Sequence, residues 1–227
     1  MKYRAEYLYT GETAEDTVLT HMQQNDPKGE LMVFVSKMVP TADSSRFYAL
    51  GRVFSGTLLH GTKVKVLDEN YKPGSKEGCV YATVSRTYLM MGKQVEAVEN
   101  VPAGGIALIL GVDHALNKTG TITTSEGAHC IRPLKHAISP IVRVAVSCKK
   151  QQELPRLIEA LRMLKKYDPL VEVSSDENTG EYIVAGGGEL HVQICLEKLR
   201  EFAGGNAEIV SSPPRVQFRE SVNAVST

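Results

Sequence analysis

The strongest candidate for chemistry in this sequence is a run of three glycines, Gly186 to Gly188, followed directly by Glu189, Leu190 and His191. A glycine-rich turn at the start of a helix can cradle phosphate with its backbone N–H groups, or it can raise a nucleophile on a sharp elbow. A Walker loop requires G-x-x-x-x-G-K-[ST], whereas here the acidic Glu189 stands where a phosphate would have to sit. An elbow requires Ser or Cys between the glycines, and neither is there. The segment therefore predicts a tight turn into a helix, without catalysis.

The cysteines and histidines have no spacing typical of a metal site. No two of the 4 cysteines are close in sequence, and no pair among the 6 histidines has zinc-finger or H-E-x-x-H spacing. The guanine-reading sequence N-K-x-D is also absent, because Asn117 and Lys118 are followed by Thr119 and Gly120. We therefore expect free thiols in a reducing compartment, no metal site and no GTP held by this chain.

Composition and charge narrow the class of protein. The chain has 227 residues, with 26 basic and 26 acidic side chains, so a protein that coats nucleic acid through bulk charge is not expected. A local basic patch stays compatible with that balance. The N-terminus has no apolar leader region, and no stretch approaches 18 consecutive apolar residues. We expect a cytoplasmic chain without a membrane span.

The first half has the pattern of a small β-barrel. Residues 1–30 are polar and weakly patterned, and from 31 to 136 short apolar runs alternate with glycine-containing turns, with no helical periodicity between them. In the run 46–56, for example, Phe47, Ala49 and Val53 point to one side. We expect strands at 31–38, 46–56, 62–67, 79–90, 94–98 and 105–111. Many short strands separated by regular turns favour a barrel.

The second half, residues 139–212, has a different pattern. A strand at 140–148 is followed by an amphipathic helix at 153–166, whose apolar stripe comprises Leu154, Leu157, Ile158, Leu161 and Leu164. Strands at 170–175 and 181–186, a second helix and a strand at 206–211 complete the order β-α-β-β-α-β. This is the ferredoxin-like arrangement, so we expect a mainly β domain followed by an α+β domain. After Pro213 and Pro214, the strand-like run up to 222 has no expected partner in this chain.

The second helix of this domain carries two apolar faces. At 100° per residue, Val192, Cys195 and Leu199 fall on one face, which we expect against the sheet, whereas Leu190 and Ile194 fall on nearly the opposite side with His191 beside them. A helix in a two-layer domain needs only one apolar face. The second face is therefore either an edge of the core or a docking surface for another domain.

Six segments of the chain resemble one family. They are "VSKMVP" (35–40), "GRVFSGTLLHGTKV" (51–64), "YLMMG" (88–92), "VPAGGIALILGVD" (101–113), "KTGTITTSEGAH" (118–129) and "AGGGELHVQICLEKL" (185–199). Together and in this order, they resemble the eukaryotic elongation factor 2 family, the GTPases that drive tRNA and mRNA translocation on the ribosome. The resemblance covers essentially the whole chain.

The resemblance implies a division of labour among domains. Residues 1–30 would be a linker from a GTPase domain, 31–136 the second domain, 139–212 the third domain and 213–227 the start of a fourth. The chain itself would be non-catalytic, with GTP and Mg bound by the GTPase domain of the parent protein. The expected partners are the ribosome and the factor's own GTPase and C-terminal domains, and the expected state is a monomer.

The resemblance also implies roles for particular residues. The G-E-L-H segment of such translocases faces the GTPase domain, so Gly188, Glu189, Leu190, His191 and Ile194 are expected to make interdomain contacts. Second domains of this family touch small-subunit ribosomal RNA. Candidates for phosphate contact on the first barrel strands are Arg46, Arg52, Lys63 and Lys65, for which a merely solvated strand face is the alternative.

Two other interpretations stay open. The U5 snRNP GTPase of the spliceosome shares this architecture, although "KTGTITTSEGAH", "LMMG" and "GELH" favour the ribosomal factor. An independent enzyme is the third alternative. It is supported only by scattered polar residues, because no nucleophile–base set and no metal cluster is visible in the sequence.

Overall fold

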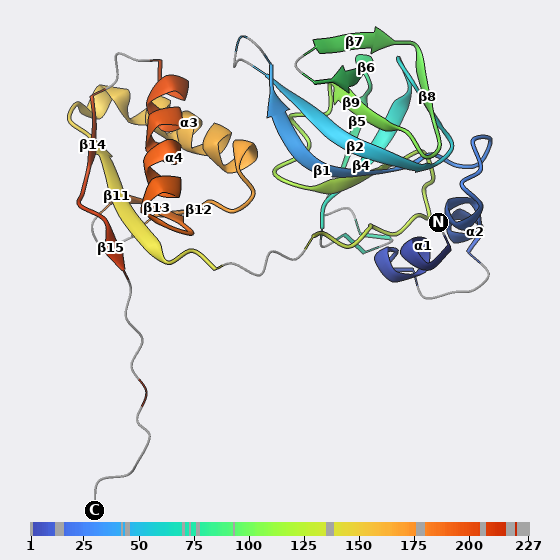
Figure 1. Ribbon diagram of the computed structural model, residues 1–227, viewed down its shortest axis with the longest axis horizontal. Coiled ribbons are helices and arrows are strands. Elements are labelled where there is room, and N and C mark those ends of the chain that lie inside the picture. Colours follow the sequence, from blue (N-terminus) through green and yellow to red (C-terminus); the bar gives the residue numbers. More distant parts are fainter. Residues whose placement is uncertain are drawn as a thin grey trace, which may run out of the picture. The chain divides into compact units, whose positions relative to one another are not determined.

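The chain folds into two units, Met1–Lys135 and His136–Thr227 (Figure 1). The computed structural model describes residues 2–11, 16–41, 43, 46–69, 71–72, 74–75, 78–92, 94–134, 139–175, 180–204, 208–216 and 221. The division falls beside the change of pattern in the sequence, although residues 135–138 themselves lie outside the described part. Each unit has its own core and is taken in turn.

The first unit contains a β-barrel of antiparallel strands in the order β5-β4-β10-β1-β2-β9-β6-β7. Their bounds are β1 (Met32–Pro40), β2 (Phe47–Ser55), β4 (Lys63–Leu67), β5 (Cys79–Thr83), β6 (Arg86–Met91), β7 (Gln94–Val98), β9 (Ile106–Leu110) and β10 (Gly120–Thr123). A separate pair is formed by β3 (Thr57–Leu59) and β8 (Asn100–Pro102). The alternation expected in β2 is present, since Phe47, Ala49 and Val53 are buried.

The single strand expected at 79–90 is two strands, which corrects that prediction. The chain leaves β4 after Thr83 and joins β9 at Arg86. Between them, the Val84 N–H is bonded to the Thr62 carbonyl and the Ser85 N–H to the Leu110 carbonyl. Apolar alternation continues through this crossing, which is why the sequence pattern does not reveal it.

Residues 1–30 are more than a linker, because they contain two helices packed on the barrel. These are α1 (Lys2–Leu8) and α2 (Thr17–Gln24), the latter capped by Asp16, whose side chain accepts the Val18 N–H. Ala5, Val18 and Met22 form one buried cluster with strand residues, among them Phe34 and Phe54. Both helices are short, which explains why a sequence window shows little periodicity.

The second unit is a βαββαβ domain. Its elements are β11 (Val142–Cys148), a 3-10 turn at Gln151–Glu153, α3 (Leu154–Tyr167), β12 (Glu172–Ser175), β13 (Tyr182–Gly186), α4 (Glu189–Phe202) and β14 (Ile209–Ser211). The antiparallel strand order is β12-β13-β11-β14, and α3 and α4 lie on one face of this sheet (Figure 1). The predicted fold class, mainly β plus α+β, is confirmed.

The core of this unit lies between the sheet and the inner faces of the two helices. From α3 it takes Leu157, Ala160, Leu161 and Leu164, and from α4 it takes Val192, Cys195 and Leu199. Ile158, which the sequence places in the stripe of α3, is instead 39% exposed, and Ala160 occupies the buried position. Ile158 follows Leu157 directly and therefore lies about 100° around the helix from it. The buried stripe of α3 is thus narrower than the five apolar positions of the sequence suggest.

A strand-like segment after the two prolines does find a partner, contrary to the sequence-based expectation. The strand β15 (Arg215–Val216) pairs antiparallel with β11, with Val142 opposite Val216 and Arg143 opposite Arg215. The end of β11 that β14 leaves free receives this short strand. Residues 217–220 and 222–227 lie outside the described residues.

Candidate functional site

The glycine run connects β13 to α4, as the sequence predicts. β13 ends at Gly186, and Gly188 is the N-cap of α4. The Gly188 carbonyl accepts a hydrogen bond from the Val192 N–H at 3.0 Å. Glu189 occupies the first turn, where a negative charge is favourable beside the helix N-terminus. A second negative group would be repelled there, so the turn is unsuited to phosphate.

The space available for a side chain differs between Gly186 and Gly188. A Cβ on Gly186 would lie 2.9 Å from both His191 Nδ1 and Val192 Cγ2, so no side chain fits while α4 keeps its place. A Cβ on Gly188 would meet nothing within 4 Å. Close backbone approach therefore applies at Gly186, whereas the space beside Gly188 is open in this unit.

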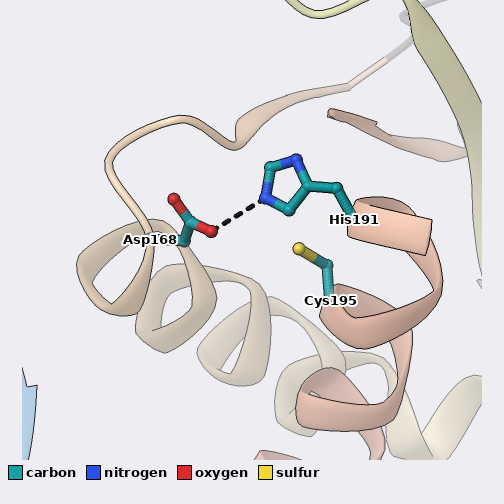
Figure 2. Close-up of side chains that lie close together, drawn as sticks. All are labelled: Asp168, His191 and Cys195. Atoms are coloured by element: carbon teal, nitrogen blue, oxygen red, sulfur yellow. Dashed lines mark hydrogen bonds and ion pairs between the residues drawn. The ribbon is translucent and has the colours of Figure 1, made fainter. Parts of the chain in front are cut away.

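His191 holds the turn through both ring nitrogens (Figure 2). Its Nδ1 accepts the Gly187 N–H at 3.1 Å, and its Nε2 lies 2.8 Å from Asp168 Oδ2. Because Nδ1 accepts a hydrogen bond from the backbone N–H of Gly187, the ring proton of the neutral imidazole is on Nε2, which donates a hydrogen bond to Asp168. The first turn of α4 is thereby tied to the C-terminal end of α3.

Cys195 approaches this pair from the next turn of α4 (Figure 2). The ligand atoms of Asp168, His191 and Cys195 all lie within 4.8 Å of one another, an arrangement that suggests either a Cys–His–Asp triad or a metal site. The sequence pattern does not predict this group, because Asp168 is 23 residues away from His191. No spacing rule connects the two.

The triad interpretation fails on the geometry and on the thiol. A cysteine nucleophile needs a free base nitrogen, but both nitrogens of His191 are already engaged. Burial, with the nearby Asp168 charge, raises the pKa of the Cys195 thiol from its ordinary 9.0 to about 12. The thiolate is therefore scarce at neutral pH, and the cysteine acts as a packing residue.

The same hydrogen bonds disfavour a metal ion. A histidine that ligates through Nε2 carries its proton on Nδ1 and donates it to an acceptor. Here Nδ1 faces the N–H donor of Gly187, which requires the opposite tautomer. The three ligand atoms are close together, but the ring proton of His191 is on Nε2. Gly187, His191 and Asp168 therefore form a hydrogen-bonded clamp.

Outside this clamp, α4 exposes the second apolar face expected from the sequence. Leu190 is 71% exposed and Ile194 is 46% exposed, whereas Val192, Cys195 and Leu199 are at most 3% exposed. His191 is partly buried because of its bond to Asp168. A hollow of about 380 Å³ adjoins this face, lined by Pro140, Leu170, Gly187, Gly188, Leu190 and His191. Its lining is mainly apolar, which suits a docked side chain better than a charged ligand.

The four basic candidates on the barrel do not form one patch. Arg46 and Lys63 are exposed, and Arg52 is half-buried with a buried Nε that has no hydrogen-bond partner within the described residues. They lie on β2 or beside it and on β4, two strands that β10 and β1 separate in the sheet.

Lys65 corrects the sequence-based assignment to phosphate contact. It is 8% exposed, and its Nζ donates to the Tyr71 hydroxyl at 2.9 Å and to the Glu126 carbonyl at 3.0 Å. Burial is the largest single influence and opposes the charged form, but the Tyr71 hydrogen bond and the electrostatic attraction of Tyr71, Cys79 and Tyr81 together outweigh it, so the pKa of Lys65 is raised. The lysine ties two loops to β4 and is not available to a phosphate.

Comparison with family models covers both units. Residues 46–123 match elongation factor Tu domain 2, and residues 139–210 match elongation factor G domain III. These are translation elongation factor domains. The domain 2 match runs from β2 to the end of β10, and the domain III match runs from β11 into β14.

The Gly186–Ile194 segment and the hollow lie within the range that matches elongation factor G domain III, so the second unit is named domain III after this match. Over these two ranges the chain is therefore similar to domains of translation elongation factors. Within the residues that the structure describes, no helix is long and apolar enough to cross a membrane.

Substitutions at the glycines should separate their roles. We expect Gly186→Ala to lower the free energy of unfolding of domain III by about 1–3 kcal/mol, because His191 or Val192 must shift. Gly188→Ala should change it by no more than about 0.5 kcal/mol. Urea unfolding followed by amide signals of β11 measures both. An equal loss of unfolding free energy at the two positions would show that there is no room for a side chain at Gly188.

Proposed function

We propose that this chain supplies domains 2 and III of a GTP-dependent ribosomal translocation factor, which moves tRNA and mRNA during protein synthesis. The observation that carries the proposal is the succession, in one chain, of an elongation factor Tu domain 2 and an elongation factor G domain III. The chain's own contribution is to hold contacts with the ribosome and with the other domains of the factor.

The chain takes no part in GTP chemistry in this proposal. It lacks the Walker and N-K-x-D sequences, and the start of α4 carries Glu189 where a phosphate would need a positive or neutral environment. GTP and Mg would be bound by a separate GTPase domain of the same factor. The second apolar face of α4 would then dock on that domain, because Leu190 and Ile194 are the apolar side chains that α4 leaves exposed.

On the barrel, Arg46 and Lys63 remain candidates for contact with ribosomal RNA phosphates. Both are exposed. Arg52 is less accessible, and Lys65 is excluded by its internal hydrogen bonds. Two isolated cations give weak binding that falls with salt, so contact with RNA would depend on the rest of the factor.

The proposed function is tested in ribosome assays. These use the longer protein that, in this proposal, contains the chain. We expect it to sediment with ribosomes in the presence of a non-hydrolysable GTP analogue, and to advance ribosome-bound mRNA by one codon when GTP is added. The isolated chain should neither bind nor hydrolyse GTP. Sedimentation with the U5 snRNP and no movement of mRNA would favour the spliceosomal GTPase instead.

A further inference from the structure

One carboxylate holds three of the residues that line the hollow beside Leu190. Asp168 Oδ1 accepts the Leu170 N–H at 2.9 Å, and Asp168 Oδ2 lies 2.8 Å from His191 Nε2. His191 Nδ1 in turn accepts the Gly187 N–H. Leu170, Gly187 and His191 line the hollow, whereas Asp168 does not. Any effect of Asp168 on a docked partner is therefore exerted through these three residues.

The hydrogen bonds require two acceptors from residue 168. The Leu170 N–H cannot change its role, and His191 cannot move its proton to Nδ1 because that atom faces the Gly187 N–H. An asparagine at 168 has the same shape but offers one acceptor and one donor. Its amide NH₂ would point at one of the two N–H groups. The site thus distinguishes a carboxylate from an amide of equal size, which simple packing would not.

We propose that Asp168 is a positioning residue, which holds the β13–α4 turn and Leu170 as the two walls of the hollow and so presents Leu190 for docking. The proposal rests on the docking role given to this face under the proposed function. Because the carboxylate joins the end of α3 to the start of α4, it also fixes the two helices of domain III at the point where the hollow lies. The hydrogen bonds Asp168–Leu170, Asp168–His191 and His191–Gly187 then determine the shape of the hollow that a partner contacts.

The hydrogen-bond network can be tested in this chain by nuclear magnetic resonance. In Asp168→Asn, the Leu170 and Gly187 amide protons should exchange with solvent on the order of tenfold faster, since each loses part of its bonded support. Glu201→Gln is the matched control. It makes the same chemical change on α4, where Glu201 accepts an exposed hydrogen bond from Lys198. Unchanged exchange at both amides in Asp168→Asn would overturn the proposal.

The unmodified chain provides a second test that does not depend on a variant folding. The ¹⁵N signals of the His191 ring should show the proton on Nε2, with Nδ1 as the acceptor. The opposite tautomer would remove the reason why residue 168 must supply two acceptors, and it would overturn the proposal as well.

The functional part is tested in the longer protein, where Asp168→Asn and Leu190→Ala should both reduce ribosome-stimulated GTP turnover and Glu201→Gln should not. If Leu190→Ala reduces turnover and Asp168→Asn does not, the docking surface stands and the positioning role is wrong. If neither variant reduces turnover, the docking role of this face fails, and the positioning role fails with it.

Discussion

Replacing Leu199 by alanine is expected to lower the free energy of unfolding of domain III by about 2–5 kcal/mol. Leu199 has no exposed surface and lies on the inner side of α4, in the core that α3 and the sheet complete. Neighbouring side chains cannot fill the volume of a lost isobutyl group without leaving their rotamers. The loss therefore includes a cavity in addition to the apolar surface no longer buried.

Leu190→Ala is the matched control, because it removes the same atoms from the same helix. With 71% of Leu190 exposed, the change should alter stability by no more than about 0.5 kcal/mol. Urea titration of each variant, followed through the amide signals of β11, measures both. A loss at Leu190 as large as that at Leu199 would mean that Leu190 belongs to the core, and the docking interpretation would lose its structural support.

The sequence predicts the regular parts of this fold because their physics is local. Strand alternation in β2, the order of elements in domain III and the two faces of α4 all follow from periodicity within one element. The exclusion of a Walker loop likewise depends only on adjacent residues such as Glu189. For these features the sequence-based expectation and the structure agree.

Features that depend on contacts distant in sequence are those that the sequence does not show. Asp168 is joined to His191 by the tertiary fold, and the buried Lys65 donates hydrogen bonds from its Nζ to the Tyr71 hydroxyl and the Glu126 carbonyl. The pairing of β15 with β11 is also non-local. Long-range pairing of this kind leaves no periodic trace, so these residues could not be placed from their types and spacing.

A second large effect is expected at the exposed face of α4 in the longer protein that we propose contains this chain. Leu190 and Ile194 together offer apolar surface beside a hollow, and such surface is commonly covered by a partner. In this chain Leu190 is open to solvent. If the face docks on a GTPase domain, Leu190 should become inaccessible in the longer protein while Cys195, buried in both, remains unchanged.

The most direct measurement of this claim is the rate at which a thiol reagent modifies a Leu190→Cys variant. The rate should be fast in the chain described here and at least about tenfold slower in the longer protein with a bound GTP analogue, a factor that corresponds to about 1.4 kcal/mol of docking free energy. Peptide mass spectrometry identifies the modified cysteine, and the rate in denaturant normalises both values. Equal rates in the chain and in the longer protein would contradict the account, because a face that stays open cannot be the contact that domain III makes.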